Sequence, residues 1–115
     1  MSKFRWHIFL ANLDPVVGSE QGRTRPVLVI SEDEINRILP VVNVIPLTSM
    51  KEGRKIYPNE VFLTSNVTGL SKNSIALCYQ IRTLDKKRFI KKIGEVSDEE
   101  AREEIRDTIC FQLGI

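Results

Sequence analysis

Residues 18–30 read GSEQGRTRPVLVI, a polar loop that runs directly into a short apolar segment. Pro26 opens the run PVLVIS, which is typical of a strand buried on both faces, and proline is tolerated at the first residue of a strand. The loop carries an acid, an amide, two arginines and two glycines, although a turn needs only the glycines. These residues predict a buried strand from Pro26, preceded by a loop with more chemistry than a turn requires.

Strand-like segments flank this one on both sides. Residues 6–13 are rich in aromatic and branched side chains and end at Asp14-Pro15, a pair that favours a turn. The rest of the chain predicts one polar turn of helix at 32–37, strands at 40–49, 59–65, 74–84 and 89–96, and turns at 65–74 and 85–88. The segment 74–84 is expected to be one long strand, whereas 89–96 is shorter and carries lysines that suit an edge strand.

The C-terminal residues 97–115 are the clearest helix in the sequence. Ser97 is predicted as its N-cap with Glu100 completing a capping box, and Gly114 is placed to end it. Its apolar face carries side chains at i, i+4 spacing, namely Ala101, Ile105, Ile109 and Leu113. Strands followed by a terminal helix predict a mainly β fold in a single domain over residues 1–115, a small curled sheet or barrel with the helix packed on it.

The composition narrows the classes of function. Lysines and arginines number 17 against 15 acids, and the resulting charge of +2 is too small to indicate nucleic-acid binding through bulk charge, so an anion site must be local. Cys78 and Cys110 lie in apolar segments without C-x-x-C spacing and are expected to be reduced core residues of a cytoplasmic protein. No apolar run approaches the roughly 18 residues of a membrane span, so no membrane partner is expected.

Metal and hydroxyl-nucleophile chemistry find few candidate residues. A zinc site needs three or four ligands, and the chain has one histidine and two cysteines, so we expect no metal and no cofactor, with magnesium less firmly excluded than zinc. His7 lies in a predicted strand without a second base around it and is expected to be a packed or interface histidine. Arginine, glutamate and hydroxyl groups remain, and this set suits a phosphodiester substrate.

The loop arginines are candidates for holding a phosphate. A guanidinium group presents a planar fork of donors that matches phosphate oxygens, so Arg23 or Arg25 could stabilise the extra charge of a pentacovalent transition state. The loop glycines would allow close backbone approach. On these residues alone an alternative stays open, in which Arg25 pairs with Glu20 and only fixes the loop.

Four segments together resemble the MazF/PemK family of toxin ribonucleases: LDP at 13–15, GSEQGRTRPVLVI, PLTS at 46–49 and QIRTLDKKR at 80–88, in the family's order over almost the whole chain. The resemblance implies an SH3-like, CcdB/PemK-like curled antiparallel barrel with a C-terminal helix, working as a homodimer. It implies a metal-independent, sequence-specific endoribonuclease that cleaves single-stranded RNA, the toxin of a type II toxin–antitoxin module. The partner would be a MazE-like antitoxin whose disordered C-terminal tail occupies the RNA groove.

The resemblance also assigns catalytic residues. Arg25 matches the family's catalytic arginine, Thr48 its catalytic threonine and Glu20 its loop acid. The 2′-OH of the RNA would be the nucleophile, and cleavage would leave a 2′,3′-cyclic phosphate and a 5′-OH. Arg25 would neutralise the phosphorane and Thr48 would donate a hydrogen bond to a non-bridging oxygen, while Glu20 would either take the proton of the 2′-OH or orient Arg25.

Candidate RNA-binding residues surround this set. They are Gly18, Ser19 and Gln21 in the loop, Tyr79, Gln80 and Arg82 in the predicted long strand, and Lys51 and Arg54 in a charged connection. Each has a structural alternative, since Arg82 and Asp85 could lock a turn and charged loops are often only solvated. Tyr79 stands where the family usually has an acid and would either stack on a base or pack, and Trp6-His7 replaces a usual Gly and acid.

Two other functions remain open on the same fold. CcdB-like relatives bind DNA gyrase without catalysis, and the fold alone does not separate them from a ribonuclease. The set Glu20, Arg25 and Thr48 favours the ribonuclease, because a gyrase binder does not need it. A generic SH3-like interaction module would need an aromatic-lined groove, and only 7% of the residues are Phe, Trp or Tyr.

Overall fold

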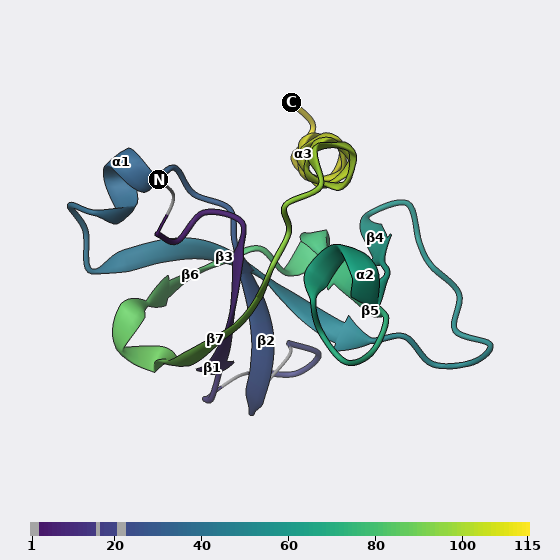
Figure 1. Ribbon diagram of the computed structural model, residues 1–115, viewed down its shortest axis with the longest axis horizontal. Helices are drawn as coiled ribbons and strands as arrows, with labels where there is room; N and C mark the ends of the chain where they lie inside the picture. Colours follow the sequence, from purple (N-terminus) through teal and green to yellow (C-terminus); the bar gives the residue numbers. More distant parts are fainter. Residues whose placement is uncertain (1–2, 16, 21–22) are drawn as a thin grey trace.

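The computed structural model describes residues 3–15, 17–20 and 23–115, in which a curled antiparallel sheet carries a C-terminal helix (Figure 1). The strand order is β4-β5-β3-β2-β1-β7, and β6 pairs with β3 beside this path. The elements are β1 His7–Asn12, β2 Thr24–Val29, α1 Asp33–Asn36, β3 Val41–Ser49, β4 Glu60–Leu63, α2 Ser65–Thr68, β5 Ser74–Leu77, η1 Cys78–Gln80, β6 Arg82–Asp85, η2 Lys86–Arg88, β7 Phe89–Glu95 and α3 Glu99–Leu113. The predicted mainly β fold with a C-terminal helix is confirmed.

The sheet curls without closing in the described part of the chain. β4 and β7 stand at its two ends and share no registered pairs. β7 pairs with β1 alone, and the exposed Lys91 and Lys92 lie on it, which discourages pairing with another strand. The prediction of a lysine-bearing edge strand is therefore confirmed, whereas a closed barrel is not seen.

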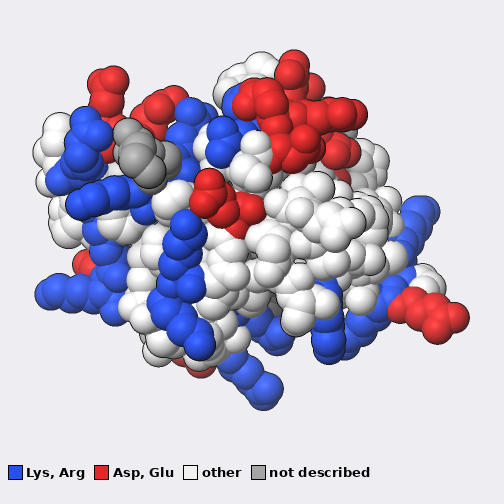
Figure 2. All heavy atoms as spheres, viewed as in Figure 1, with Lys and Arg blue, Asp and Glu red and all other residues white. Residues whose placement is uncertain are grey.

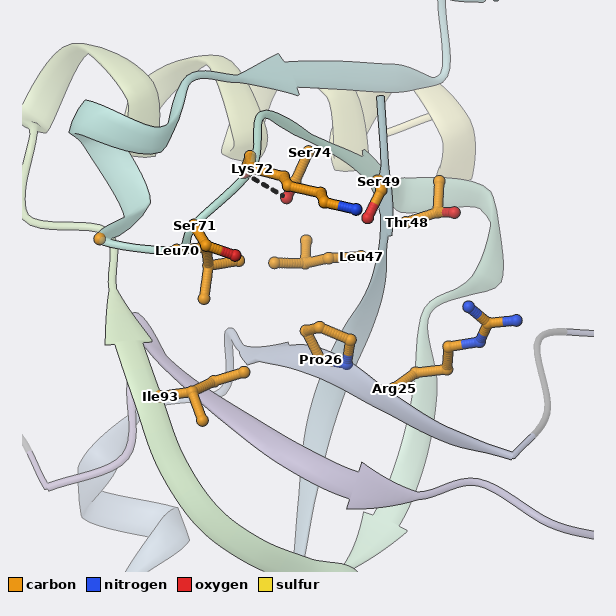
Figure 3. A pocket seen from close by; sticks show the side chains of 11 residues that line it. Arg25, Pro26, Leu47, Thr48, Ser49, Leu70, Ser71, Lys72, Ser74 and Ile93 are labelled. Atoms are coloured by element: carbon orange, nitrogen blue, oxygen red, sulfur yellow. Dashed lines mark hydrogen bonds between the residues drawn. The ribbon is translucent and has the colours of Figure 1, made fainter. Parts of the chain in front are cut away.

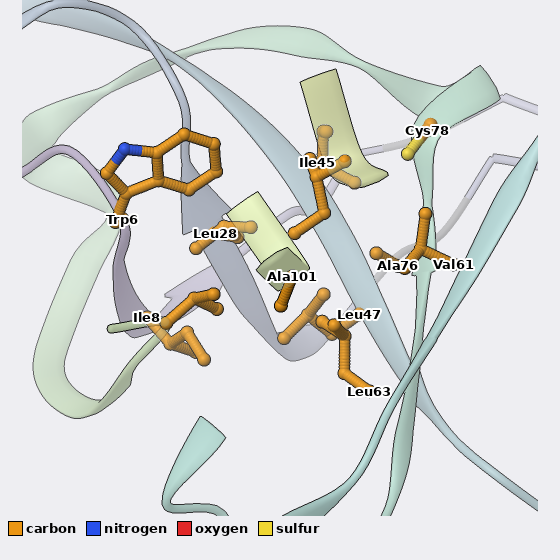
Figure 4. Close-up of a cluster of buried hydrophobic side chains, with 12 residues drawn as sticks. Trp6, Ile8, Leu28, Ile45, Leu47, Val61, Leu63, Ala76, Cys78 and Ala101 are labelled. Atoms are coloured by element: carbon orange, nitrogen blue, oxygen red, sulfur yellow. The ribbon is translucent and has the colours of Figure 1, made fainter. Parts of the chain in front are cut away.

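Two apolar clusters form the core, one on each face of β2. The larger cluster lies between the sheet and α3, and it contains Trp6, Ile8, Leu28, Ile45, Leu47, Val61, Leu63, Ala76, Cys78, Val96, Ala101 and Ile105 (Figure 4). Val27 and Val29 face the smaller cluster, which Phe4, Phe9 and Phe89 cover from outside. Alternate residues of β2 thus serve opposite cores, as expected for a strand buried on both faces.

The predicted long strand over residues 74–84 is wrong, because a 3-10 turn breaks it. β5 pairs with β3 up to Leu47↔Ala76, and β6 resumes the pairing at Val44↔Arg82. Residues 77–81 therefore lie opposite only two residues of β3, Ile45 and Pro46. The extra residues on the 77–81 side form the turn η1. Pro46 lies in the facing stretch and offers no backbone N–H to a ladder. As a result β7, with seven residues, is longer than either half and is not the shorter strand expected.

Helix α3 begins one residue later than predicted. Asp98, not Ser97, is the N-cap, and its carboxylate accepts a hydrogen bond from the Ala101 backbone N–H at 3.0 Å. Gly114 ends the helix as predicted, with a φ of 71° that favours glycine. Ala101 and Ile105 are buried on the expected face, whereas Leu113 is half exposed.

Smaller features follow from local chemistry. The predicted turn at 65–74 contains the short helix α2, and the predicted helical turn at 32–37 is α1. Cys78 is buried and Cys110 half-buried, both as free thiols, and burial raises the pKa of Cys78 to about 12. No helix in the described ranges is long and apolar enough to cross a membrane.

Candidate functional site

The candidate site arises where β3 leaves β2. The two strands pair at Val29↔Val44, Leu28↔Ile45 and Val27↔Pro46, and from Leu47 onward β3 pairs with β5 instead. Continued pairing would set Arg25 opposite Thr48. Since β2 pairs there only with β1, the strands separate and a hollow opens between the two residues.

This hollow is a pocket of about 340 Å³. It is lined by Arg25 and Pro26 of β2, Leu47, Thr48 and Ser49 of β3, Gly69, Leu70, Ser71 and Lys72 of the loop after α2, Ser74 of β5 and Ile93 of β7. In Figure 3 the guanidinium of Arg25 and the hydroxyl of Thr48 lie on the same side of the pocket. The structure therefore brings together two of the three predicted catalytic residues.

The lining of this pocket is cationic and rich in hydroxyl groups. Among the residues that the structure describes, it contains two cations, four hydroxyl side chains and no carboxylate. Arg25 supplies planar donors and Lys72 a point charge, while the hydroxyls can donate to or accept from a ligand. Such a lining fits a phosphate group better than a cation or an apolar ligand.

Sequence reasoning missed Lys72 and Ser71. Their segment, GLSKNS, was predicted only as a turn, and nothing within it indicates a neighbour at Thr48. The antiparallel return of β5 along β3 brings this loop to the pocket, through the pairs Thr48↔Ile75 and Ser49↔Ser74. The signal that could have found them is the pairing of two strands about 25 residues apart, which requires the register.

Glu20 lines a different pocket, of about 180 Å³, together with Tyr79, Gln80, Ile81 and Arg82. Its carboxylate accepts a hydrogen bond from the Val17 backbone N–H at 2.7 Å, which fixes the tip of the loop. The structure thus groups the predicted loop acid with three predicted RNA contacts, and Arg25 with Thr48 in the larger pocket.

The rest of the loop is organised from its base. Arg23 has a φ of 61°, its backbone N–H donates to Asp14 at 2.7 Å, and its carbonyl accepts from Leu13. Gly18 and Ser19 are exposed at the tip, and Gln21 lies outside the described residues. Arg88 of the QIRTLDKKR segment donates to the carbonyls of Asn12 and Asp14. Two of the segments that carry the family resemblance therefore touch at the loop base.

Arg54 is held by a buried acid. Its guanidinium donates to both carboxylate oxygens of Glu60, each at 2.9 Å, and the side chain of Glu60 is 2% exposed. The hydrogen bond from Arg54 and one from the Tyr57 backbone hold the pKa of Glu60 below its usual range, and the same pair raises the pKa of Arg54. This geometry gives Arg54 a structural contact in place of the solvated position considered as the alternative, whereas Lys51 is exposed on the loop.

Tyr79 is 41% exposed on η1 and lines two hollows. One is the Glu20 pocket, and the other is an apolar groove of about 390 Å³ formed with Tyr57, Pro58 and Phe111 beside the Arg54–Glu60 pair. A third hollow, between β4, α2 and α3, carries only acidic charges, and Figure 2 shows these acids gathered over α3. The charges that line this hollow are thus opposite in sign to those that line the Arg25 pocket.

The chain is similar in sequence and in structure to known proteins. The family model described as "PemK-like, MazF-like toxin of type II toxin-antitoxin system" matches residues 4–113. The Endoribonuclease MazF of Staphylococcus saprophyticus is 40% identical over 111 residues, covering 96% of this chain and 91% of that protein. A crystal structure of MazF from Deinococcus radiodurans superposes with a TM-score of 0.82 at 28% identity over 100% of this chain and 99% of that one. A MazE-MazF complex from the same organism gives 0.74 at 30% identity, over 97% and 96%.

Proposed function

Because the chain belongs to the family of PemK-like, MazF-like toxins of type II toxin–antitoxin systems, we propose that it cuts single-stranded RNA at short preferred sequences without a metal ion. It is a MazF-type endoribonuclease toxin, as its homology to the staphylococcal enzyme indicates. We also propose roles for Arg25, Thr48 and Glu20 in this cleavage. Cleavage of messenger RNA in the cytoplasm would stop translation and growth.

The observation that carries this proposal is that Arg25 and Thr48 line one pocket in which no described carboxylate takes part. The 2′-OH gives its proton to a base and its oxygen attacks the neighbouring phosphorus. The bond to the 5′-oxygen breaks, that oxygen takes a proton from water, and the products are a 2′,3′-cyclic phosphate and a 5′-OH. Arg25 neutralises the charge that develops on the phosphorane, and the Thr48 hydroxyl donates to a non-bridging oxygen. Both groups act on the transition state more strongly than on the ground state.

Glu20 is proposed as the base that takes the proton of the 2′-OH. Its carboxylate is exposed in the pocket beside Gln80 and Arg82, where an incoming RNA strand would meet it. The other role, orienting Arg25, predicts that Glu20→Gln keeps most of the activity and its pH dependence, because an amide still accepts hydrogen bonds. If Glu20 is the base, the cleavage rate of Glu20→Gln should lose the acidic limb of its pH dependence.

The test uses purified protein, a long RNA and a chelator. We expect cleavage at a small set of sites, 5′-OH ends at each, and no cleavage where a 2′-deoxynucleotide replaces the residue before the cut. Cleavage that needs added magnesium, or that persists at the deoxy position, would contradict the mechanism. Growth arrest relieved by a gyrase mutation, with RNA left intact, would favour the CcdB-like alternative instead.

Two partners are proposed with this activity. Solved neighbours include MazE-MazF complexes, which supports an antitoxin partner. We propose that its disordered C-terminal tail fills the RNA groove. A second copy of this chain is proposed on the apolar groove of Tyr57, Tyr79 and Phe111, which joins η1 to α3. Sedimentation should give a dimer at micromolar concentration that Phe111→Glu weakens, and a stable monomer would contradict it.

A further inference from the structure

The pocket that holds Arg25 and Thr48 has a second side that the proposed cleavage chemistry does not use. This side consists of Ser71 and Lys72 in the loop after α2, and of Ser49 next to Thr48. In Figure 3 the side chain of Lys72 extends from that loop toward Ser49, so its ammonium group lies on the rim of the same pocket. Within the described part of the chain, no carboxylate forms a salt bridge with Lys72.

The loop that carries Lys72 is held at its C-terminal end, where Asn73 bonds to two other elements. The Asn73 side chain accepts from the Ser65 backbone N–H at 2.9 Å, and the Asn73 carbonyl accepts from Met50 at 2.8 Å. The hydroxyl of Ser74 donates to the Lys72 carbonyl at 3.4 Å. The backbone of Lys72 is therefore fixed to β3 and to α2, and only the aliphatic stem must be ordered when a ligand binds.

Two cations on one acid-free pocket favour an anion with more than one charged group. Arg25 and Lys72 carry like charges on the lining of one pocket, so negative charge that enters this pocket is attracted to both. A single-stranded RNA carries one phosphate per nucleotide, so a strand whose cleaved phosphate lies at Arg25 brings a neighbouring phosphate with it. The hydroxyls of Ser49 and Ser71 can donate to the oxygens of that second group.

We propose that Lys72, with Ser49 and Ser71, forms a second phosphate subsite that binds the phosphate next to the cleaved one. The inference rests on the proposed ribonuclease function and adds to it a group that touches no reacting atom. Lys72 therefore contributes to binding and to the alignment of the strand, independently of base sequence.

The experiment compares Lys72→Ala with Lys87→Ala, which removes the same charge. Lys87 lies on η2, directly after β6. The last residue of β6, Asp85, pairs with Val41, the first residue of β3, whereas Thr48 lies near the other end of β3. We expect Lys72→Ala to raise KM roughly tenfold with kcat nearly unchanged, and to lower the slope of log affinity against log salt by about 0.7, the value of one single-strand phosphate contact. Lys87→Ala should change neither quantity, and Lys72→Arg should restore most of the affinity.

A chemical test locates the contact. Each phosphate of a mapped substrate is replaced in turn by an uncharged methylphosphonate, and the affinity of the wild type and of Lys72→Ala is measured with the cleaved nucleotide in its deoxy form. At one linkage next to the cut, this replacement should lower the RNA affinity of the wild type but not that of Lys72→Ala. Equal losses in both proteins at every linkage, or equal behaviour of Lys72→Ala and Lys87→Ala, would overturn the subsite while leaving cleavage intact. Failure of the wild type to cut RNA would overturn the proposed function as well.

Discussion

Arg25 on β2 and Arg54 in the loop between β3 and β4 both line hollows of the molecule, and the charges around them differ. The buried carboxylate of Glu60 grips Arg54 with two hydrogen bonds of 2.9 Å, whereas no acid lines the pocket of Arg25. A guanidinium whose fork is filled by a buried acid stabilises the fold, and one that faces hydroxyls and another cation is suited to a ligand. Residue type does not distinguish the two, but the acid in the lining does.

Removing Arg25 should give the largest change in activity. Arg25→Ala is expected to lower kcat about a thousandfold, because it deletes the main donor to the phosphorane, and to leave the urea midpoint nearly unchanged. The measurement is single-turnover cleavage beside urea unfolding. Arg23→Ala, two residues earlier in the chain, is the matched control and should keep most of the activity. Equal losses in the two variants would erase the distinction between these arginines.

Removing Arg54 should produce the reverse pattern. Arg54→Ala is expected to lower the free energy of unfolding by about 3 kcal/mol, since it leaves the Glu60 carboxylate buried with one backbone donor, Tyr57 N–H. The remaining folded protein should cleave RNA at a rate close to wild type. The double replacement Arg54→Met with Glu60→Leu should recover most of the stability, whereas a loss of RNA affinity in that stable variant would give Arg54 a role in binding.

A third change tests the wall of the Arg25 pocket. A Cβ added at Gly94 would lie 2.5 Å from the Thr68 backbone carbonyl and 3.2 Å from the Leu70 side chain. Gly94→Ala should therefore cost about 2 kcal/mol of stability and weaken cleavage, because the loop that carries Leu70 and Lys72 must shift. Urea unfolding and KM measure the two effects. Lys91→Ala on the same strand should alter neither stability nor KM. If Gly94→Ala also changed neither, the loop that carries Leu70 would be able to shift without cost.

Acid should weaken the contribution of the Glu60 carboxylate to stability, with the smallest effect of the series. The pKa of Glu60 is lowered in the folded protein, so its contribution to stability is complete above its unfolded pKa of about 4.3 and is lost as the pH falls through the folded value. The urea midpoint of the wild type should therefore fall more between pH 7 and pH 3 than that of Glu60→Gln. Parallel curves would contradict a contribution from this carboxylate.

Local patterns were sufficient to predict most of the fold. The alternating and continuous apolar runs predict β1, β2, β3, β4 and β7, and the acidic start and Gly114 predict α3. The break between β5 and β6 escaped prediction because SIALCYQIRTL is apolar in its middle, and the surplus that forces η1 is visible only against β3. The N-cap was misplaced because Ser97 and Asp98 are both good caps.

The candidate site was predictable in part. Arg25 and Thr48 were singled out from the resemblance and meet in one pocket, whereas Lys72 and the acid that holds Arg54 depend on which strands are neighbours. Arg54 and Glu60 are six residues apart in the sequence, yet nothing local indicates that Glu60 points inward. The roles assigned to Glu20, Gln80 and Arg82 stay predictions, and they now share one pocket.

The surplus of residues 77–81 over the facing stretch of β3 has a consequence for how such a protein can change. Gln80 sits in η1, outside both paired stretches, so its identity can vary without moving a pair of β5 or of β6. The part of the molecule that faces Glu20 is thus an exchangeable insert on a fixed frame, and a new preference for RNA sequence could be gained there while Arg25 and Thr48 keep their register.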